Sequence, residues 1–96
     1  MENPNLGQKW IEKTTKQLSD WRNVPIKEPK WSLEGEDYTI HVVSTRSGKR
    51  ERESFTRAQL EKCGNQELRF QIERRLIGMF QRLEAAEAGS RFRDKT

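Results

Sequence analysis

The chain has few of the residues that hold a fold together through covalent bonds or metal ions. Its 96 residues include one cysteine, Cys63, and one histidine, His41. A single cysteine excludes an internal disulfide, and one histidine with one distant cysteine is too small a ligand set for a metal site. We therefore expect no metal and no cofactor, and we expect a reducing compartment, the cytoplasm.

Signals for secretion, membranes and phosphate-binding loops are also missing. Residues 1–7 contain no basic segment followed by an apolar run, so we expect no secretory signal. No apolar run approaches transmembrane length, which removes membranes from the expected partners. The six glycines are dispersed rather than gathered in a loop that would cradle phosphate. His41 lies in no nucleophile motif, so we expect a protein that is not an enzyme.

The chain is rich in charge instead. Charged residues make up 35% of it and hydrophobic residues 31%, with a net charge of +4. This composition predicts a single small domain spanning residues 1–96 with a thin core. Three tryptophans and four phenylalanines enlarge that core because each buries a large apolar area. The net charge is lower than that of a dedicated nucleic-acid-binding domain.

Apolar residues recur at helical spacing in the N-terminal part of the chain. Trp10, Ile11, Leu18 and Trp21 form one stripe, which predicts a helix over about residues 7–22. Residues 1–6 are expected to be flexible. The helix should end near Asn23, because Pro25 disfavours helical geometry at the residue before it. Residues 24–30 contain two prolines and are expected to form a stiff connector.

Residues 31–55 alternate between apolar and polar residues, as expected for a three-stranded meander. Strands are predicted at residues 31–33, 38–45 and 50–55. A two-residue loop at Ser47 and Gly48 would pair Ile40 with Phe55 and gather the apolar side chains on one face. A three-residue loop with a bulge at Gly48 would move Phe55 to the opposite face, so we favour the first register.

A capped helix should follow the last strand. Thr56 and Gln59 have the spacing of a capping box, and Phe55 and Leu60 have that of a hydrophobic staple. Gly64 is expected to end this helix in the left-handed conformation, and Asn65 to cap a second helix that runs to about residue 88. Gly89 and Ser90 end the pattern, so residues 89–96 are expected to be a flexible basic tail.

The long helix carries two apolar surfaces. Its main row is formed by Ile72, Leu76, Met79, Leu83 and Ala86, and this row should cover the sheet. Phe70 and Ile77 lie away from it and need a second partner, which is either the first helix or another molecule. If it is another molecule, a protein partner or a second copy of the chain would contact four candidate interface residues: Trp10, Trp21, Phe70 and Ile77.

Basic side chains form two candidate nucleic-acid surfaces. One is the hairpin tip, with Arg46, Lys49, Arg50 and Arg52, and the other is the polar side of the long helix, with Arg74, Arg75 and Arg82. Neither contains the interleaved aromatic residues of a single-strand stacking platform. Glu51 and Glu53 also lie beside the hairpin arginines, and would neutralise them if the tip is merely a solvated surface.

These observations predict an α+β domain. The expected architecture is an N-terminal helix, a three-stranded antiparallel meander and a long C-terminal helix packed on one sheet face. The expected function is that of a small intracellular binding or adaptor protein acting through protein–protein contacts. The alternative is a nucleic-acid-associated accessory protein that uses the basic hairpin or the basic helix face.

Overall fold

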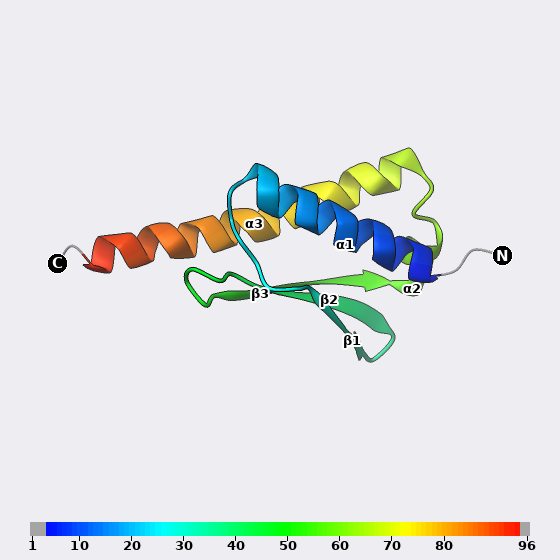
Figure 1. The fold of residues 1–96 in the computed structure, drawn as a ribbon. Helices are drawn as coiled ribbons and strands as arrows, with labels where there is room; N and C mark the ends of the chain where they lie inside the picture. Colours follow the sequence, from blue (N-terminus) through cyan, green and yellow to red (C-terminus); the bar gives the residue numbers. More distant parts are fainter. Residues whose placement is uncertain (1–3, 95–96) are drawn as a thin grey trace.

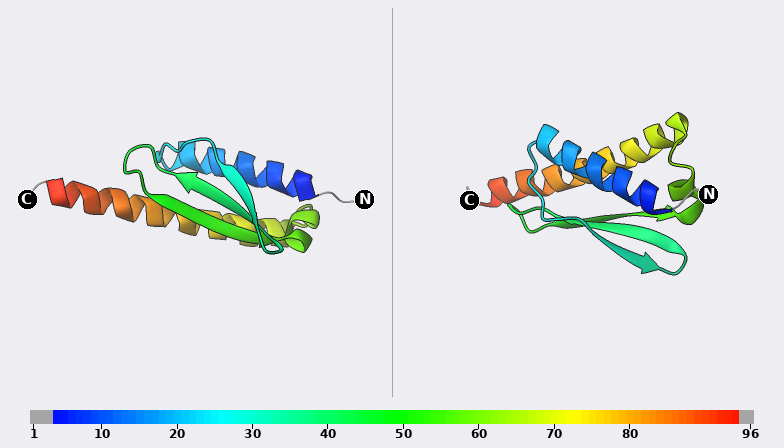
Figure 2. Two further views of the ribbon diagram at one scale, coloured as in Figure 1. Left: turned by 90° about the horizontal axis from the view of Figure 1, so that it is seen from below. Right: turned by 45° about the vertical axis from the view of Figure 1, so that its right-hand side comes forward.

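Two layers, one of helices and one of strands, make up the structure (Figure 1). The computed structural model describes residues 4–94, and the side chains within residues 5–88. The elements are α1 (Pro4–Trp21), β1 (Lys30–Glu34), β2 (Asp37–Val43), β3 (Arg50–Thr56), α2 (Arg57–Glu61) and α3 (Gln66–Asp94). The strands form an antiparallel sheet in the order β1-β2-β3, and α1 and α3 lie side by side over one of its faces (Figure 2). This confirms the predicted α+β architecture.

Both terminal helices extend further than the sequence pattern predicted. α1 begins at Pro4, a residue suited to the first turn because its nitrogen has no hydrogen to leave unpaired. α3 continues to Asp94, so the predicted end at Gly89 and Ser90 is wrong. The expectation of flexible ends also covered residues 1–3 and 95–96, which lie outside the described residues.

α1 ends as predicted, at Trp21, and the chain reverses at Asn23. Asn23 adopts the left-handed conformation with φ of 55°, which asparagine tolerates better than most residues. The Val24 amide donates to the Ser19 carbonyl at 3.0 Å and the Asn23 amide to the Asp20 carbonyl at 3.3 Å, the two bonds of a Schellman motif. Val24 is buried, so the helix end is anchored in the core.

The connector after α1 runs along the edge of β2. Ile26 forms an isolated antiparallel bridge with Ser44, and the Lys27 amide donates to the Val43 carbonyl at 3.0 Å. β1 then pairs with β2 from Lys30 onward. These bonds fix the connector to the sheet, and they hold α1 over the sheet as the stiff proline-containing segment suggested.

The β2–β3 register differs from the predicted one by two residues. Phe55 pairs with Tyr38, and Ile40 pairs with Glu53. The loop is longer than predicted because the Gly48 amide donates to the Ser44 carbonyl four residues earlier, with Gly48 at φ of 73°. A shift of two residues keeps every side chain on its predicted face, because successive side chains alternate with a period of two.

The joint between β3 and α2 has the predicted chemistry. The Gln59 amide donates to the Thr56 hydroxyl at 3.1 Å, and the Thr56 amide donates to the Gln59 side chain at 2.9 Å. Asn65 caps α3, with its side chain accepting from the Leu68 amide at 3.0 Å. Gly64, however, does not have a positive φ, so its predicted left-handed conformation is wrong. α2 ends earlier, and Lys62 is its C-cap.

One continuous core lies between the two layers. The sheet contributes Ile40, Val42 and Phe55 to this core, α1 contributes Ile11 and Leu18, and α2 contributes Leu60. The residues of α3 that are buried in it are Ile72, Leu76, Met79, Phe80 and Leu83. Gly7 lets α1 approach α2 closely. A Cβ atom added at Gly7 would lie only 2.8 Å from the Leu60 Cα and would overlap the Leu60 carbonyl oxygen.

We predict that Leu76→Ala lowers the free energy of unfolding by about 2–5 kcal/mol, because Leu76 is completely buried at the centre of the α3 row. Phe70→Ala is the matched control on the same helix. Phe70 is 61% exposed, so its truncation should change stability by about 0.5 kcal/mol or less. Denaturant titration measures both, and a Leu76→Ala loss below about 1 kcal/mol would contradict the packing described here.

Candidate binding surfaces

The inner face of β3 is linked to α3 by alternating charges. Glu53 accepts from Arg75 at 2.9 Å and from Arg82 at 2.9 Å, and Glu51 forms a second, short bond with Arg82. Arg75 also donates to the Ser54 carbonyl at 2.7 Å. The bonds to these two carboxylates raise the pKa of Arg82. We call Glu51, Glu53, Arg75 and Arg82 the β3–α3 ladder.

The ladder pairs two of the three arginines of the predicted basic helix face with carboxylates. Arg74, Arg75 and Arg82 were predicted to form one nucleic-acid surface, but Arg75 and Arg82 are bonded to carboxylates of the sheet. Arg74 instead lies with its guanidinium 6.0 Å from the ring centre of the exposed Phe70. The structure therefore does not bring the three arginines together as free cations on one surface.

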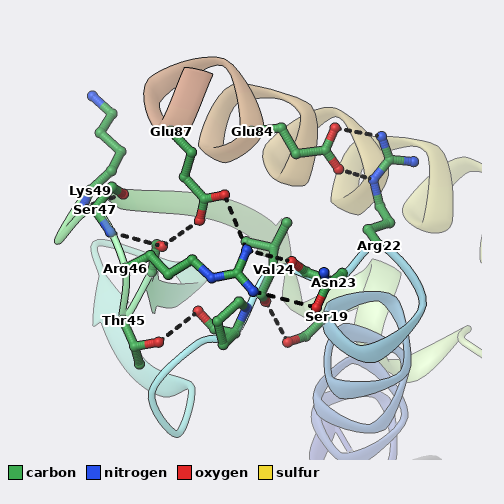
Figure 3. Close-up of polar contacts among 12 residues, drawn as sticks. Ser19, Arg22, Asn23, Val24, Thr45, Arg46, Ser47, Lys49, Glu84 and Glu87 are labelled. Atoms are coloured by element: carbon green, nitrogen blue, oxygen red, sulfur yellow. Dashed lines mark hydrogen bonds and ion pairs between the residues drawn. The ribbon is translucent and has the colours of Figure 1, made fainter. Parts of the chain in front are cut away.

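Arg46 fixes the hairpin tip to neighbouring elements of the structure. This side chain donates to the Asn23 carbonyl at 3.1 Å, and its guanidinium lies 3.9 Å from a carboxylate oxygen of Glu87 (Figure 3). Glu87 is only 8% exposed, and it accepts from the Ser44 hydroxyl at 2.9 Å. Nearby, Arg22 donates twice to Glu84, at 2.6 and 3.0 Å. Arg46 thus links the end of α1, the hairpin loop and α3.

Lys49, Arg50 and Arg52 have different environments. Lys49 lies 3.9 Å from Glu51, whereas Arg50 and Arg52 extend on the opposite, open face of the sheet. Arg52 is 3.3 Å from Glu34. Arg50 forms no ion pair within the described part of the chain. Glu51 and Glu53 point toward α3, so they do not neutralise these two arginines.

The open sheet face carries a broad, shallow hollow of about 860 Å³. His41 is part of its lining, and the Nε2 atom of this residue lies 2.6 Å from the Ser32 hydroxyl. Basic side chains around it are Lys27, Lys30, Arg50 and Arg52. Among the residues that the structure describes, Lys27 and Lys30 also lack ion pairs. The open sheet face therefore brings together three cations without ion pairs in the described residues, Lys27, Lys30 and Arg50, in a lining that also contains Glu28 and Glu51.

A second hollow, of about 590 Å³, lies between α1 and α3. Leu18 and Trp21 line it from α1, and Ile77 lines it from α3. Trp21 is 87% exposed, although tryptophan is highly buried on average. Asp20 and Glu73 form part of the same lining, and neither is in an ion pair within the described residues. We call this apolar hollow with acidic margins the α1–α3 groove.

The other two predicted interface residues, Phe70 and Trp10, are not part of the lining of this groove. Phe70 is exposed and lies seven residues before Ile77, which places the two side chains about 20° apart on α3. Trp10 is half-buried, and the guanidinium of Arg69 lies 5.2 Å from its ring centre. The structure thus brings Trp21 and Ile77 together, places Phe70 on the same side of α3 as Ile77, and leaves Trp10 half-buried. The first helix accounts for part of the second apolar surface of α3, and leaves the rest exposed.

The described residues show little that resembles a catalytic or metal centre. Among the described side chains, within residues 5–88, no three His, Cys, Asp or Glu converge in a way that could hold a metal ion. Cys63 is buried, and this burial raises the pKa of its thiol. None of the described helices is both long and apolar enough to cross a membrane.

Sequence reasoning missed the β3–α3 ladder and the buried carboxylate of Glu87. A signal for the ladder was present, because Glu51 and Glu53 share a strand face with Phe55, and Arg75 and Arg82 are seven residues apart on α3. No comparable signal existed for Glu87. Its partners, Ser44 and Arg46, are brought to it by the four-residue hairpin loop that the predicted register lacked.

We predict that Glu87→Ala lowers the free energy of unfolding by roughly 1–3 kcal/mol, because it removes the acceptor of a buried hydroxyl and the partner of Arg46. Glu84→Ala, one turn earlier, removes a more exposed pair and should cost about 1 kcal/mol or less. Thermal or denaturant unfolding of the two variants gives the comparison, and an equal loss for both would contradict the role assigned to Glu87.

No protein-family model matches the chain, no curated protein matches it, and no solved structure matches its fold at a significant level. The functional interpretation therefore depends on the surfaces described above.

Proposed function

We propose that the chain is a small non-enzymatic binding or adaptor domain that recognises a partner protein through the α1–α3 groove. The observation that carries the proposal is Trp21, which is 87% exposed beside the apolar hollow lined by Leu18 and Ile77. Exposed tryptophans next to apolar pockets are typical of the residues that dominate protein–protein binding energy. The buried thiol of Cys63 is consistent with work in a reducing compartment, the cytoplasm.

The groove also indicates the chemistry of its partner. Its floor is apolar, and its margins include the unpaired carboxylates of Asp20 and Glu73. An amphipathic helix with apolar residues at i, i+3, i+4 and i+7 would fill a channel between two helices. Lysine or arginine beside that apolar stripe would complement the acidic margins. We therefore propose a basic amphipathic helix of another protein as the ligand.

We predict that a synthetic amphipathic peptide with leucines on one face and flanking lysines binds the domain and shifts the emission of Trp21 to shorter wavelength. Trp21→Ala should weaken its binding at least about tenfold, as expected for a binding hot spot. Leu33→Ala is the matched control, because Leu33 is another exposed apolar residue, 64% exposed, but lies in β1. Equal affinity for wild type and Trp21→Ala, or for a glutamate-flanked peptide, would contradict the proposal.

The open sheet face supports a second candidate, contact with nucleic acid. Its specific support is the group of Lys27, Lys30 and Arg50, cations without ion-pair partners in the described structure, around the 860 Å³ hollow. Such side chains would contact phosphates without reading the base sequence. Trp31 is part of this lining, but its indole bonds to Glu12 of α1 and is not free to stack on bases, so the expected affinity is modest.

For this second candidate we predict salt-dependent binding to duplex or single-stranded nucleic acid. Arg50→Ala should reduce the slope of log affinity against log salt by about one unit, because one phosphate contact is lost. Arg82→Ala is the control, since Arg82 is engaged in the β3–α3 ladder and its loss should leave the slope unchanged. Affinity weaker than about 0.1 mM at low salt would exclude this candidate.

A further inference from the structure

The outer edge of β1 is unprotected, unlike the outer edge of β3. On β3 the Ser54 carbonyl accepts from Arg75, and the ladder joins the strand to α3. β1 is the other terminal strand of the sheet, and within the described residues no further strand pairs with it. The β1–β2 end of the sheet also turns away from the helix layer (Figures 1 and 2). An open strand edge presents unpaired backbone groups that can pair with another chain.

The sequence of β1 is complementary to itself. The strand reads Lys30-Trp31-Ser32-Leu33-Glu34, with a basic residue at one end and an acidic residue at the other. If two copies pair in antiparallel fashion about Ser32, Lys30 of each copy lies opposite Glu34 of the other, and each Trp31 lies opposite a Leu33. Directly opposed charges of unlike sign and opposed apolar pairs both stabilise an antiparallel pair.

We propose that the chain forms a homodimer in which two β1 strands pair about a twofold axis at Ser32, which joins the two sheets into one. This surface is separate from the α1–α3 groove, so the inference goes beyond the proposed function. Lys30 has no ion pair within the described residues and is free for the contact. Glu34 already lies 3.3 Å from Arg52, but its side chain remains 46% exposed and can accept from a second cation.

The exposure of Leu33, and the side of the sheet on which Leu33 and Trp31 lie, both agree with this register. Leu33 is 64% exposed, although it pairs with Tyr38 on the side of the sheet that faces the helices. Trp31 lies on the same side, with its indole nitrogen donating to Glu12 at 2.6 Å. A second copy would bring its own Trp31 against Leu33. Both copies then have their helices on the same side of the joined sheet, and Lys30, Ser32 and Glu34 lie on the open side.

Neighbouring registers fit less well. Moving the axis to Trp31 places Glu34 opposite Glu28, which are like charges, and moving it to Leu33 leaves only residues 32–34 of the strand paired with strand residues. A shift by half a step places Trp31 opposite Glu34 and turns the helices of one copy to the other side of the sheet. The paired strand has only five residues, so the interface is below the standard size, and the dimer should be weak.

The experiment combines a charge swap with sedimentation equilibrium, over about 10 µM to 1 mM as suits a small interface. Wild type should reach twice the 11.4 kDa chain mass as concentration rises. Lys30→Glu and Glu34→Lys should each weaken dimerisation roughly tenfold, because each creates two like-charge contacts. The double variant Lys30→Glu/Glu34→Lys should restore it, and Trp21→Ala should leave it unchanged. Failure of the double variant to restore the dimer would overturn the register.

A cysteine at the axis gives an independent test. In the proposed register the two Ser32 Cα atoms lie about 4.5–5.5 Å apart, within the range of a disulfide. Ser32→Cys should therefore form a disulfide-linked dimer under mild oxidation. Lys30→Cys is the control, since its two copies would lie roughly 13 Å apart. Cys63 is buried and should not react. A chain that stays monomeric at 1 mM, with no cross-link through Ser32→Cys, would overturn the proposal.

Discussion

The burial of one row of α3 against the sheet determines where everything else in this protein lies. Leu76, Met79, Phe80 and Leu83 are completely buried, and they join the inner residues of β2 and β3 in a single core. Only 31% of the chain is hydrophobic, and α3 supplies five of the thirteen buried hydrophobic residues in the described structure. The other sides of α3 form ion pairs with β3, pack against α1 or face solvent. The β3–α3 ladder follows the edge of this contact, where carboxylates of the strand meet arginines of the helix.

Features that depend on residues close together in the sequence were predicted correctly, whereas the pairing of residues far apart in the sequence was not. The capping box at Thr56 and the apolar row of α3 depend on residues three to seven positions apart, and both were correct. The strand faces were also correct, because the alternation of side chains survives a shift of two residues. The register itself was wrong, because the loop closes with a bond from Gly48 to Ser44 that the Ser47-Gly48 dipeptide does not encode.

The candidate surfaces were predictable only in part. Sequence spacing showed that α3 has two apolar surfaces, but not that α1 would cover Ile77 partly and leave Phe70 exposed. The sequence likewise offered no reason to distinguish the seven basic side chains of the two candidate nucleic-acid surfaces from one another. The structure separates Arg75 and Arg82, which are bonded to the sheet, from Arg50, which forms no ion pair in the described residues. Which charge is free depends on tertiary pairing, and periodicity does not contain that information.

The way in which α1 is attached has a consequence for folding and binding. The hairpin and α2 are neighbours in sequence, whereas α1 is held by contacts between distant positions, such as Gly7 with Leu60 and Arg22 with Glu84. Closing such long loops costs chain entropy, so α1 should dock late in folding and detach first when the structure opens locally. The α1–α3 groove exists only while α1 is docked. A ligand in the groove would therefore also hold the N-terminal helix in place, and binding would suppress local opening.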